Sequence, residues 1–204
     1  INDGNLAYNL EDDKFTVDKI RYKLSAKHKF NIKSLRFMSQ VHKDNVIKVT
    51  NKSPLLVGDC DAMITNEIGI PLMVVVADCI PILINDRKKG VVAVIHAGRN
   101  STYLEIVKKV VNIMVNDYSC HINDLEAEFG PSINKCCYEV NNIIANLFIK
   151  RFGEDIVKNN HIDLQGVNKK ILLKMGLTNI KTSTICTKCS KNMYFSYRKD
   201  KKCG

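Results

Sequence analysis

The sequence predicts a single α+β domain with layered sheets, and three observations support this prediction. Short β-branched runs, as at Ile80–Ile84 and Val91–Ile95, occur beside segments of helical periodicity. Strands and helices mix without the strict alternation that is typical of parallel α/β folds. The chain has 204 residues, of which 45% are hydrophobic, and contains no linker rich in Pro, Gly or Ser. We therefore treat residues 1–204 as one domain with a sizeable core.

The first part of the chain is expected to hold one helix and several short strands. Thr16 is the expected N-cap of the helix, which carries Val17, Ile20 and Leu24 on its apolar face. Strands are expected at Leu35–Gln40, Val46–Val49, Ala62–Thr65 and Pro71–Val76. The first two of these strands should pair with each other across a short polar turn.

A buried hairpin is expected where two apolar runs flank the polar turn Asn85–Gly90. If Ile84 pairs with Val91, the same register places Cys79 opposite His96. The Cβ atoms of such a pair lie about 4.5–5.5 Å apart, close enough to share a metal ion or a proton. A register slip of one or two residues would still leave both side chains at the same end of the hairpin.

The second part of the chain is expected to hold three helices. Thr102 and Glu105 form a capping box, so the first helix should begin there and offer its N–H groups to an anion such as phosphate near His96. Its inner face should consist of Val107, Val110, Val111 and Met114. The other helices should span Tyr138–Phe152 and Asp163–Gly176, and strands are expected at Glu126–Phe129, Ile180–Ile185 and Tyr194–Arg198.

Charge and hydropathy narrow the class of protein. The net charge is +10, but the lysines are scattered and no RNA-binding motif is present, so we expect a solvated basic surface and no nucleic-acid partner. The same charge would favour an anionic small substrate. The sequence has no apolar run of 18 residues and no N-terminal signal segment. We therefore expect a cytoplasmic protein with no membrane partner.

The cysteines are expected to be free thiols or metal ligands, because disulfides are rare in a chain without a secretion signal. Cys186–Cys189 is a lone C-x-x-C motif. A structural zinc site needs a second pair, and the adjacent residues Cys136 and Cys137 match the usual spacing poorly. Plain thiols are therefore predicted there. The eight cysteines are Cys60, Cys79, Cys120, Cys136, Cys137, Cys186, Cys189 and Cys203.

The candidate site consists of Cys79, His96 and His42, each placed at the end of an expected strand. Two imidazoles and a thiolate are three good zinc ligands, and they would leave a fourth position for water or substrate. The spacing alone leaves open that His42 is a surface histidine, that His96 is a hydrogen-bonded core residue and that Cys79 is an inert thiol. Asp78 is either a proton-handling group or a structural cap.

Six short motifs occur in an order that resembles the YfiH family, also called the laccase-domain or polyphenol-oxidase-like family and described as purine nucleoside phosphorylases. The resemblance covers nearly the whole chain from His42 onward. Its motifs are Gln40-Val41-His42, Asp61-Ala62-Met63-Ile64-Thr65, Ala77-Asp78-Cys79-Ile80-Pro81, His96-Ala97-Gly98, Gly130-Pro131-Ser132-Ile133 and Phe195-Ser196-Tyr197-Arg198.

The resemblance implies an α/β/β/α layered fold, like that of hydrolases related to cytotoxic necrotizing factor. It also implies a zinc site formed by His42, Cys79 and His96, with copper as the other candidate metal. The expected reactions are phosphorolysis of adenosine, inosine and methylthioadenosine, and deamination of adenosine. Purine nucleoside and phosphate are thus the expected partners. Where the family usually has H-A-G-W-R-G, this chain has Arg99 in place of tryptophan, which removes an apolar wall and adds a cation.

Three functions remain in competition at this point. In a zinc-dependent phosphorylase, Arg198, Arg99 or the helix end at Thr102 would bind phosphate or substrate. In a metal-free cysteine hydrolase, His96 would activate Cys79 as the nucleophile. A basic nucleic-acid-binding module is the third candidate. A multicopper oxidase needs about ten histidines in H-x-H pairs, whereas this chain has five histidines and no such pair. It could hold only a single copper bound by two histidines and a cysteine.

Overall fold

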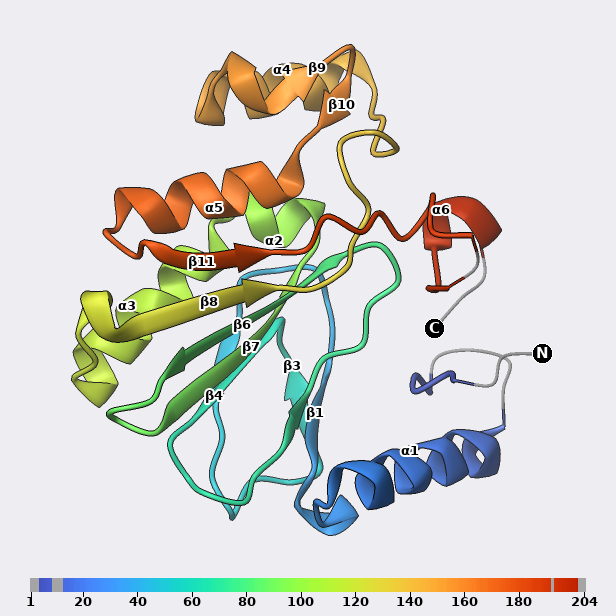
Figure 1. The fold of residues 1–204 in the computed structure, drawn as a ribbon, viewed down its shortest axis with the longest axis vertical. Coiled ribbons are helices and arrows are strands. Elements are labelled where there is room, and N and C mark those ends of the chain that lie inside the picture. Colours follow the sequence, from blue (N-terminus) through green and yellow to red (C-terminus); the bar gives the residue numbers. More distant parts are fainter. Residues whose placement is uncertain (1–3, 9–12, 192, 202–204) are drawn as a thin grey trace.

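Two sheets lie face to face at the centre of the structure, a computed structural model that describes residues 4–8, 13–191 and 193–201 (Figure 1). The larger sheet has six strands in the spatial order β11-β8-β6-β7-β4-β2. Their bounds are β2 (Val46–Lys48), β4 (Ala62–Thr65), β6 (Ile80–Asp86), β7 (Val91–Ala97), β8 (Leu125–Phe129) and β11 (Asn179–Thr182). The smaller sheet has the order β3-β1-β5, with β1 (Arg36–Ser39), β3 (Leu56–Asp59) and β5 (Leu72–Met73).

Strand directions are mixed in the larger sheet. Its centre is antiparallel, since β6 pairs with β7 and β8, and β7 pairs with β4. The two edge strands are parallel to their neighbours, β2 to β4 and β11 to β8. The smaller sheet is entirely parallel. This combination confirms the predicted α+β class.

Helices lie on the outer side of each sheet and complete the α/β/β/α layers (Figure 1). Over the larger sheet lie α2 (Arg99–Tyr103), α3 (Ile106–Tyr118) and α5 (Leu164–Lys174), with α4 (Asn142–Phe152) above α5 in the figure. On the smaller sheet lies α1 (Lys14–His28), whose Arg21 guanidinium stacks 4.3 Å from the ring centroid of Phe37. The remaining elements are short, namely η1 (Ile32–Ser34), η2 (Ile122–Asp124), η3 (Glu154–Ile156), β9 (Val157–Lys158), β10 (His161–Ile162) and α6 (Tyr197–Asp200).

The hydrophobic core forms two layers on the two faces of the larger sheet. On β7, Ala93 and Ile95 face the helices, whereas Val94 faces the smaller sheet. This arrangement follows from the two-residue period of a strand. The predicted inner face of α3 is confirmed, since its four residues are fully buried, namely Val107, Val110, Val111 and Met114.

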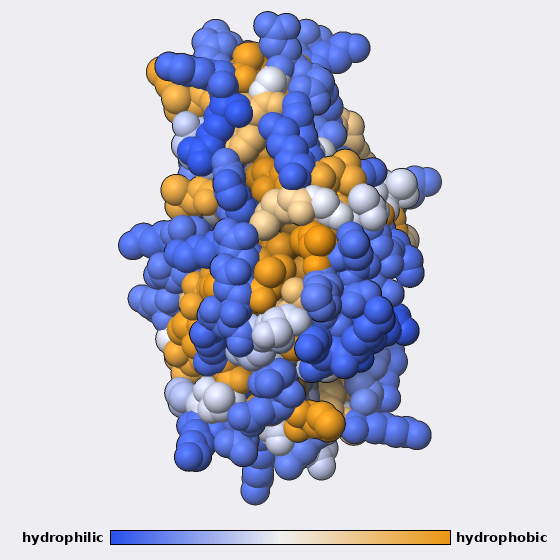
Figure 2. Space-filling view, turned by 90° about the vertical axis from the view of Figure 1, so that its left-hand side faces the viewer, coloured by the Kyte–Doolittle hydropathy of each residue, from blue (hydrophilic) through white to orange (hydrophobic). Residues whose placement is uncertain are grey.

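Polar side chains cover much of one face of the molecule. Figure 2 shows that the side to the left in Figure 1 is largely hydrophilic, with hydrophobic residues between the polar ones near the middle of the face. Among the described helices, none combines the length and the apolar character that crossing a bilayer requires.

Side-chain caps set the helix ends, and they differ in part from the prediction. Asp163 caps α5 as predicted, by accepting the N–H of Gly166 at 2.7 Å. The N-cap of α1 is Asp13 and not Thr16, because the Asp13 carboxylate accepts the Thr16 N–H at 2.9 Å. Helix α4 begins later than predicted because Asn141 is its N-cap.

The predicted pairing of the first two strands is wrong. Strand β1 belongs to the smaller sheet, whereas β2 pairs with β4 in the larger one. The buried carboxylate of Asp61 accepts the backbone N–H groups of Val41, His42 and Lys43, and His42 adopts a φ of 56°. These bonds turn the chain out of one sheet and into the other.

The predicted register of the β6–β7 hairpin is also wrong. Ile84 pairs with Ala93 instead of Val91. The strand continues to Asp86, whose carboxylate accepts N–H groups of the turn that follows, so this turn is shorter than expected. Gly90 closes it with a φ of 66°, in the left-handed region that glycine tolerates best.

Two further strands differ from their predictions. The segment Tyr194–Arg198 is not a strand, because Ser196 caps the short helix α6 there. Strand β5 covers only two residues of the predicted Pro71–Val76, and the chain then leaves the sheet. The Gln40 side chain takes the place of the missing strand-to-strand hydrogen bonds. It accepts the N–H of Val75 at 3.0 Å and donates to the carbonyl of Val75 at 2.7 Å.

Candidate functional site

The structure brings His42, Cys79 and His96 together. One ligand atom from each lies within 4.8 Å of the other two. Nε2 of His42 is 3.9 Å from Sγ of Cys79, and the two imidazole rings meet edge to face with centroids 4.7 Å apart. The three predicted metal ligands therefore form one cluster, which we call the His–Cys cluster.

Three strand ends supply these side chains. His96 lies near the end of β7, Cys79 directly precedes β6, and His42 follows β1. The residue opposite His96 is Pro81, so Cys79 lies beyond the paired strands and not across from His96 as predicted. A φ of 87° at Asp78 bends the chain just before the thiol. The register is thus shifted by two residues, and Cys79 and His96 still lie at the same end of the hairpin, as expected for a slip of this size.

Asp61 orients both histidines, a role that the sequence did not reveal. Its fully buried Oδ1 lies 2.7 Å from Nδ1 of His96 and accepts the backbone N–H of His42 at 2.9 Å. With Nδ1 held by the carboxylate, the Nε2 atom of His96 is the one left for the cluster. Carboxylate–histidine pairs of this kind commonly support metal sites. The available sequence signal was the motif that begins at Asp61, to which no chemical role had been given.

Electrostatics favour a charged thiolate–imidazolium pair. Burial lowers the pKa of His96, but the hydrogen bond to Asp61 and the nearby Cys79 raise it to about 9. Burial raises the pKa of Cys79, but its interactions with His42 and His96 bring it down to about 7. Burial likewise raises the pKa of Asp61, but the hydrogen bond and charge of His96 and the backbone N–H groups of Lys43 and His42 together lower it below its ordinary value. At neutral pH a bound metal would take the place of the proton on His96.

Gly98 leaves the space that the cluster occupies. A Cβ at this position would lie 3.0 Å from Sγ of Cys79 and 3.1 Å from Cδ2 of His42. Both distances are tighter than ordinary contacts between side chains. The H-A-G motif therefore combines a ligand with the small residue that lets the other two approach it.

Asp78 acts as an anchor for the C-terminal segment. One of its carboxylate oxygens accepts the hydroxyl of Thr187 at 2.6 Å, and the other accepts the backbone N–H of Arg198 at 2.6 Å. Its carbonyl accepts the N–H of Ile133 at 2.9 Å. Of the two roles considered for Asp78, these contacts favour the structural one.

Two arginines and a tyrosine lie beside the cluster. The Arg198 guanidinium stacks 4.9 Å from the ring centroid of Tyr138 and donates to the carbonyl of Glu139 at 2.7 Å. Burial raises the pKa of Tyr138, while the charges of Arg99 and Arg198 lower it and those of Cys79 and Asp78 raise it further. The charges of all four groups thus act on Tyr138. It was missed because it follows two cysteines in a segment that the sequence assigned to a helix.

Thr102 does not have its predicted place. The capping box is wrong, because α2 already begins at Arg99, and α3 begins after Glu105 without a side-chain cap. The hydroxyl of Thr102 is fully buried and accepts a hydrogen bond from Asn168 of α5 at 2.9 Å. Its polar atom is therefore directed at α5, and its role in binding phosphate stays a prediction.

The cluster suits the metal that the sequence predicted. Two imidazoles and a thiolate make a mixed nitrogen and sulfur donor set, which zinc accepts readily and which also suits copper. Asp61 supplies the outer partner, and Gly98 supplies the room. Three ligands leave a coordination position open, as catalytic zinc sites do.

Comparison with known proteins places the chain in a family. A family model described as "Multi-copper polyphenol oxidoreductase laccase" matches residues 1–204. The chain belongs to this family. The crystal structure of Bacillus licheniformis YfiH superposes on this chain with a TM-score of 0.91 and is 25% identical in sequence, and the match covers 97% of this chain and 80% of that one. This likeness confirms the resemblance to YfiH proteins. The structure of YlmD from Geobacillus stearothermophilus has a TM-score of 0.92 and 26% identity, and the match covers 98% of this chain and 80% of that one.

Relatives in this laccase-domain family carry names of nucleoside enzymes. A protein of Clostridium acetobutylicum named purine nucleoside phosphorylase is 34% identical over 85% of this chain and 74% of its own length. A protein of an unknown prokaryote named adenosine deaminase RL5 is 36% identical over 68% of this chain and 56% of its own. YlmD of Bacillus subtilis, named purine nucleoside phosphorylase, is 27% identical over 96% of this chain and 77% of its own length.

Proposed function

We propose that this protein is a zinc-dependent purine nucleoside phosphorylase with adenosine deaminase side activity. The observation that carries the proposal is the His–Cys cluster, held by Asp61 and flanked by Arg198, Arg99 and Tyr138. The names of the relatives support the choice of substrate. Adenosine, inosine and methylthioadenosine are the proposed nucleosides.

In the proposed reaction, an oxygen of inorganic phosphate forms a bond to C1′ of the ribose while the bond from C1′ to N9 of the purine breaks. The bonding electrons leave with the base, which takes up a proton, and ribose 1-phosphate remains. Arg198 and Arg99 would bind the phosphate, because a guanidinium offers paired donors to its oxygens. The zinc, held by His42, Cys79 and His96, would supply Lewis-acid stabilisation of developing negative charge.

Tyr138 is the proposed hydrogen-bond donor to the substrate. Because burial raises its pKa, its phenol keeps its proton near neutral pH. A neutral phenol can donate to an oxygen or nitrogen that gains electron density. In deamination, which replaces the 6-amino group with a water oxygen and releases ammonia, the same phenol would donate to the base.

The donor set also weighs against laccase chemistry in spite of the family description. The whole sequence has five histidines, namely His28, His42, His96, His121 and His161, and no H-x-H pair. His42 and His96 are the two that reach the cluster. A blue-copper centre together with a trinuclear cluster needs many more imidazoles than that.

Product analysis tests the proposal. Adenosine is incubated with the zinc-loaded protein with and without phosphate, and the products are separated by chromatography. We expect adenine and ribose 1-phosphate only when phosphate is present, and a slower release of inosine in both cases. Unchanged adenosine, inosine and methylthioadenosine under all conditions would refute the phosphorylase assignment.

A pair of arginine variants tests the phosphate site. Arg198→Gln should raise KM for phosphate about tenfold, which is the loss of one charge-assisted contact worth about 1.4 kcal/mol. Arg87→Gln is the matched control, because Arg87 lies in the exposed turn between β6 and β7 and pairs only loosely with Glu126, at 3.4 Å. Equal kinetics of the two variants would remove Arg198 from the phosphate site.

A cysteine hydrolase is the second candidate, and the lowered pKa of Cys79 together with the raised pKa of His96 favours it. Such a pair is typical of an activated thiol nucleophile. Iodoacetamide labelling of Cys79 in protein saturated with zinc separates the two functions. A zinc-bound thiolate should be protected, so rapid labelling together with ester or amide hydrolysis would favour the hydrolase.

A further inference from the structure

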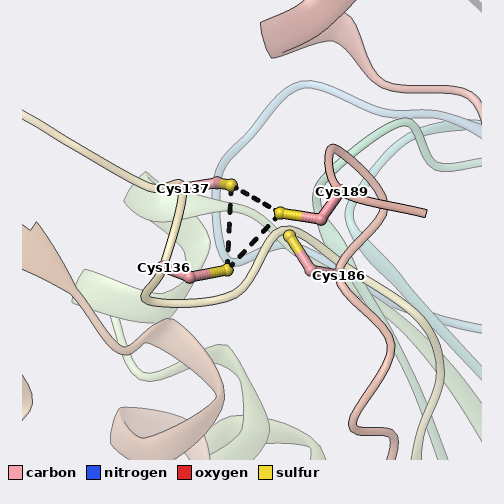
Figure 3. Close-up of side chains that lie close together, drawn as sticks. All are labelled: Cys136, Cys137, Cys186 and Cys189. Carbon is pink, nitrogen blue, oxygen red and sulfur yellow. Dashed lines mark hydrogen bonds between the residues drawn. The ribbon is translucent and has the colours of Figure 1, made fainter. Parts of the chain in front are cut away.

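Four cysteines from two distant segments meet beside the C-terminal part of the chain. Cys136 and Cys137 lie in the segment that follows β8, and Cys186 and Cys189 lie in the turn that follows β11 (Figure 3). The strands β8 and β11 are parallel neighbours, so the segments that follow them leave the same edge of the sheet. We call this group the four-cysteine cluster.

Backbone bonds hold the two segments in this position independently of the thiols. The N–H of Thr187 donates to the carbonyl of Ser132 at 3.0 Å, and the N–H of Ser132 donates to the carbonyl of Ile185 at 3.4 Å. The side-chain Nδ2 of Asn134 adds a bond to the carbonyl of Thr184 at 3.0 Å. The cysteines therefore meet because the chain segments are aligned.

The sulfur positions match a tetrahedral metal site closely. The distance between Sγ atoms is 3.7 Å for Cys136 and Cys137, 3.8 Å for Cys136 and Cys189, and 3.0 Å for Cys137 and Cys189, and all four sulfurs lie within 4.8 Å of one another. Zn–S bonds of about 2.3 Å at tetrahedral angles separate the sulfurs by about 3.8 Å. Two of the three distances match this value, and the third would open by about 0.8 Å on binding.

The sulfur of Cys186 has the surroundings of a metal-bound thiolate. It accepts the backbone N–H of Asn134 at 3.5 Å, and the N–H groups of Lys188 and Cys189 are also directed at it. When a C-x-x-C segment wraps around one metal ion, two N–H groups of the turn point at the sulfur of its first cysteine. Such donors stabilise a thiolate and orient it.

We propose that Cys136, Cys137, Cys186 and Cys189 bind a structural zinc ion, at a site separate from the His–Cys cluster. Four thiolates fill a tetrahedral zinc and leave no position for water, which is typical of structural sites. The lone C-x-x-C motif was taken for plain thiols because its second pair is two adjacent residues. The structure supplies that pair.

The proposed zinc site would support the active site from outside. Thr187, inside the C-x-x-C turn, bonds the carboxylate of Asp78, and this carboxylate holds the backbone of Arg198. Tyr138 directly follows Cys137 and stacks under Arg198. One ion would thus hold together the segments that carry Arg198 and Tyr138.

Counting metal in variants of the full chain tests this proposal without reference to activity. Cys79→Ala removes a ligand of the His–Cys cluster, so zinc that remains after dialysis reports the four-cysteine cluster. We expect one zinc per chain in Cys79→Ala, and none once Cys137→Ser and Cys189→Ser are added. The matched control is Cys79→Ala combined with Lys188→Ser, because Lys188 is exposed in the same turn. This variant should keep its zinc. A zinc-free Cys79→Ala protein, or zinc retained after both ligands are removed, would overturn the proposal.

A second measurement does not depend on how the serine variants fold. Cobalt added to metal-free Cys79→Ala should give the strong thiolate-to-cobalt absorption and intense ligand-field bands of a tetrahedral four-sulfur site. Weak bands typical of octahedral cobalt would contradict it. So would mass spectrometry of the unreduced protein that found Cys137 joined to Cys189, because a disulfide needs these sulfurs about 2.05 Å apart and leaves them unable to bind zinc.

Discussion

The two groups of candidate metal ligands differ in what holds them in place. The His–Cys cluster lies at the ends of sheet strands, where His96 is only 2% exposed and bonded to a fully buried Asp61. The four-cysteine cluster lies between two segments outside the sheets, and Cys136 and Cys189 are exposed. The sheets therefore organise the first group, whereas backbone bonds between loops organise the second.

The number of ligands differs as well. Three ligands leave a position open at the His–Cys cluster, and four leave none at the four-cysteine cluster. The first arrangement suits chemistry on a substrate, and the second suits holding chain segments together. Asp78 links the two regions, because it adjoins Cys79 and accepts the hydroxyl of Thr187. A structural metal placed in loops would supply the rigidity that the core supplies to the other site.

The largest expected effect comes from exchanging one cysteine in each region. Cys79→Ala should abolish base release, since losing a ligand should exceed the roughly 100-fold cost of losing an outer partner. Its melting temperature should stay close to that of the wild type. Cys189→Ser should instead lower the melting temperature and retain measurable base release. Calorimetry and product analysis on both variants check the contrast, and the reverse pattern would show that the two roles had been assigned the wrong way round.

Cys79 and Cys136, one thiol from each region, should also differ in their pH dependence. In metal-free protein the pKa of Cys79 is lowered from its ordinary value of 9 to about 7, so its thiolate forms as the pH rises through about 7. Burial first, and then hydrogen bonds with Cys186 and Cys189, raise the pKa of Cys136 to about 11, although the hydrogen bond with Cys137 lowers it. At pH 7 the thiolate fraction of Cys79 is then about 50-fold above that of a thiol with the ordinary pKa.

Iodoacetamide labelling, followed site by site with mass spectrometry, measures this difference. The labelling rate of Cys79 should have a midpoint near pH 7, whereas Cys136 should label only in alkaline solution. His42→Ala provides the control, because it removes one of the groups that lower the pKa of Cys79 and should move the midpoint upward. A midpoint near 9 for Cys79 in the unmodified chain would contradict the thiolate–imidazolium pair.

A smaller effect is expected from the outer partner of the His–Cys cluster. Asp61→Asn removes a charge that orients His96, and it replaces an acceptor oxygen with an NH₂ group that faces donors. Outer partners of metal ligands typically contribute 10–100-fold to metal affinity or activity, so we expect a loss of about that size. Zinc titration by competition with a chelator measures it.

The control for this variant is Asp59→Asn. Asp59 is exposed and lies two residues earlier, in β3. Its substitution should leave zinc affinity within about twofold, as surface substitutions usually change little. Equal losses in both variants would mean that net charge, and not the orientation of His96, accounts for the effect.

Local patterns predicted the elements of this fold better than their partners. The apolar runs at β6 and β7 and the inner face of α3 were visible because burial leaves a pattern of apolar residues in the sequence. The placement of β2 was not visible. It depends on one buried carboxylate, Asp61, that binds three N–H groups far away in the chain. The prediction of the hairpin register was wrong for a related reason. Asp86 is both the last residue of β6 and the acceptor of N–H groups in the turn, so the strand is longer and the turn shorter than the sequence indicated.

In the candidate site too, the sequence predicted the residues better than their contacts. His42, Cys79 and His96 were predicted as a set from their places at strand ends and from the family motifs, and the structure brings them together. The groups that act through other residues, Asp61 and Tyr138, were missed because their contacts are long-range. Plain thiols were predicted at the four-cysteine cluster because Cys136 and Cys137 are adjacent and match the usual ligand spacing poorly. The sequence did not show that the parallel β8–β11 pairing brings these two residues to the C-x-x-C motif, about 50 positions later in the chain.

The smallest expected effect tests the packing that lets the His–Cys cluster form. In Gly98→Ala, the added methyl group would lie 3.0 Å from Sγ of Cys79 and 3.1 Å from the His42 ring, so both side chains must move by a few tenths of an ångström. Displacements of this size in a metal site should reduce zinc affinity and base release roughly fivefold. Gly98 has a φ of −78°, which alanine also adopts, so the backbone itself should tolerate the change.

The four-cysteine cluster provides the internal control in the same molecule. Its zinc should be retained in Gly98→Ala, because none of its sulfurs is among the atoms that the new Cβ would contact. A chelator titration that resolves two classes of zinc should therefore show the weaker binding in one class only. Weakening of both classes would mean that the two regions are coupled more tightly than the Asp78 contacts suggest. No change in either class would mean that the cluster needs less room than its distances indicate.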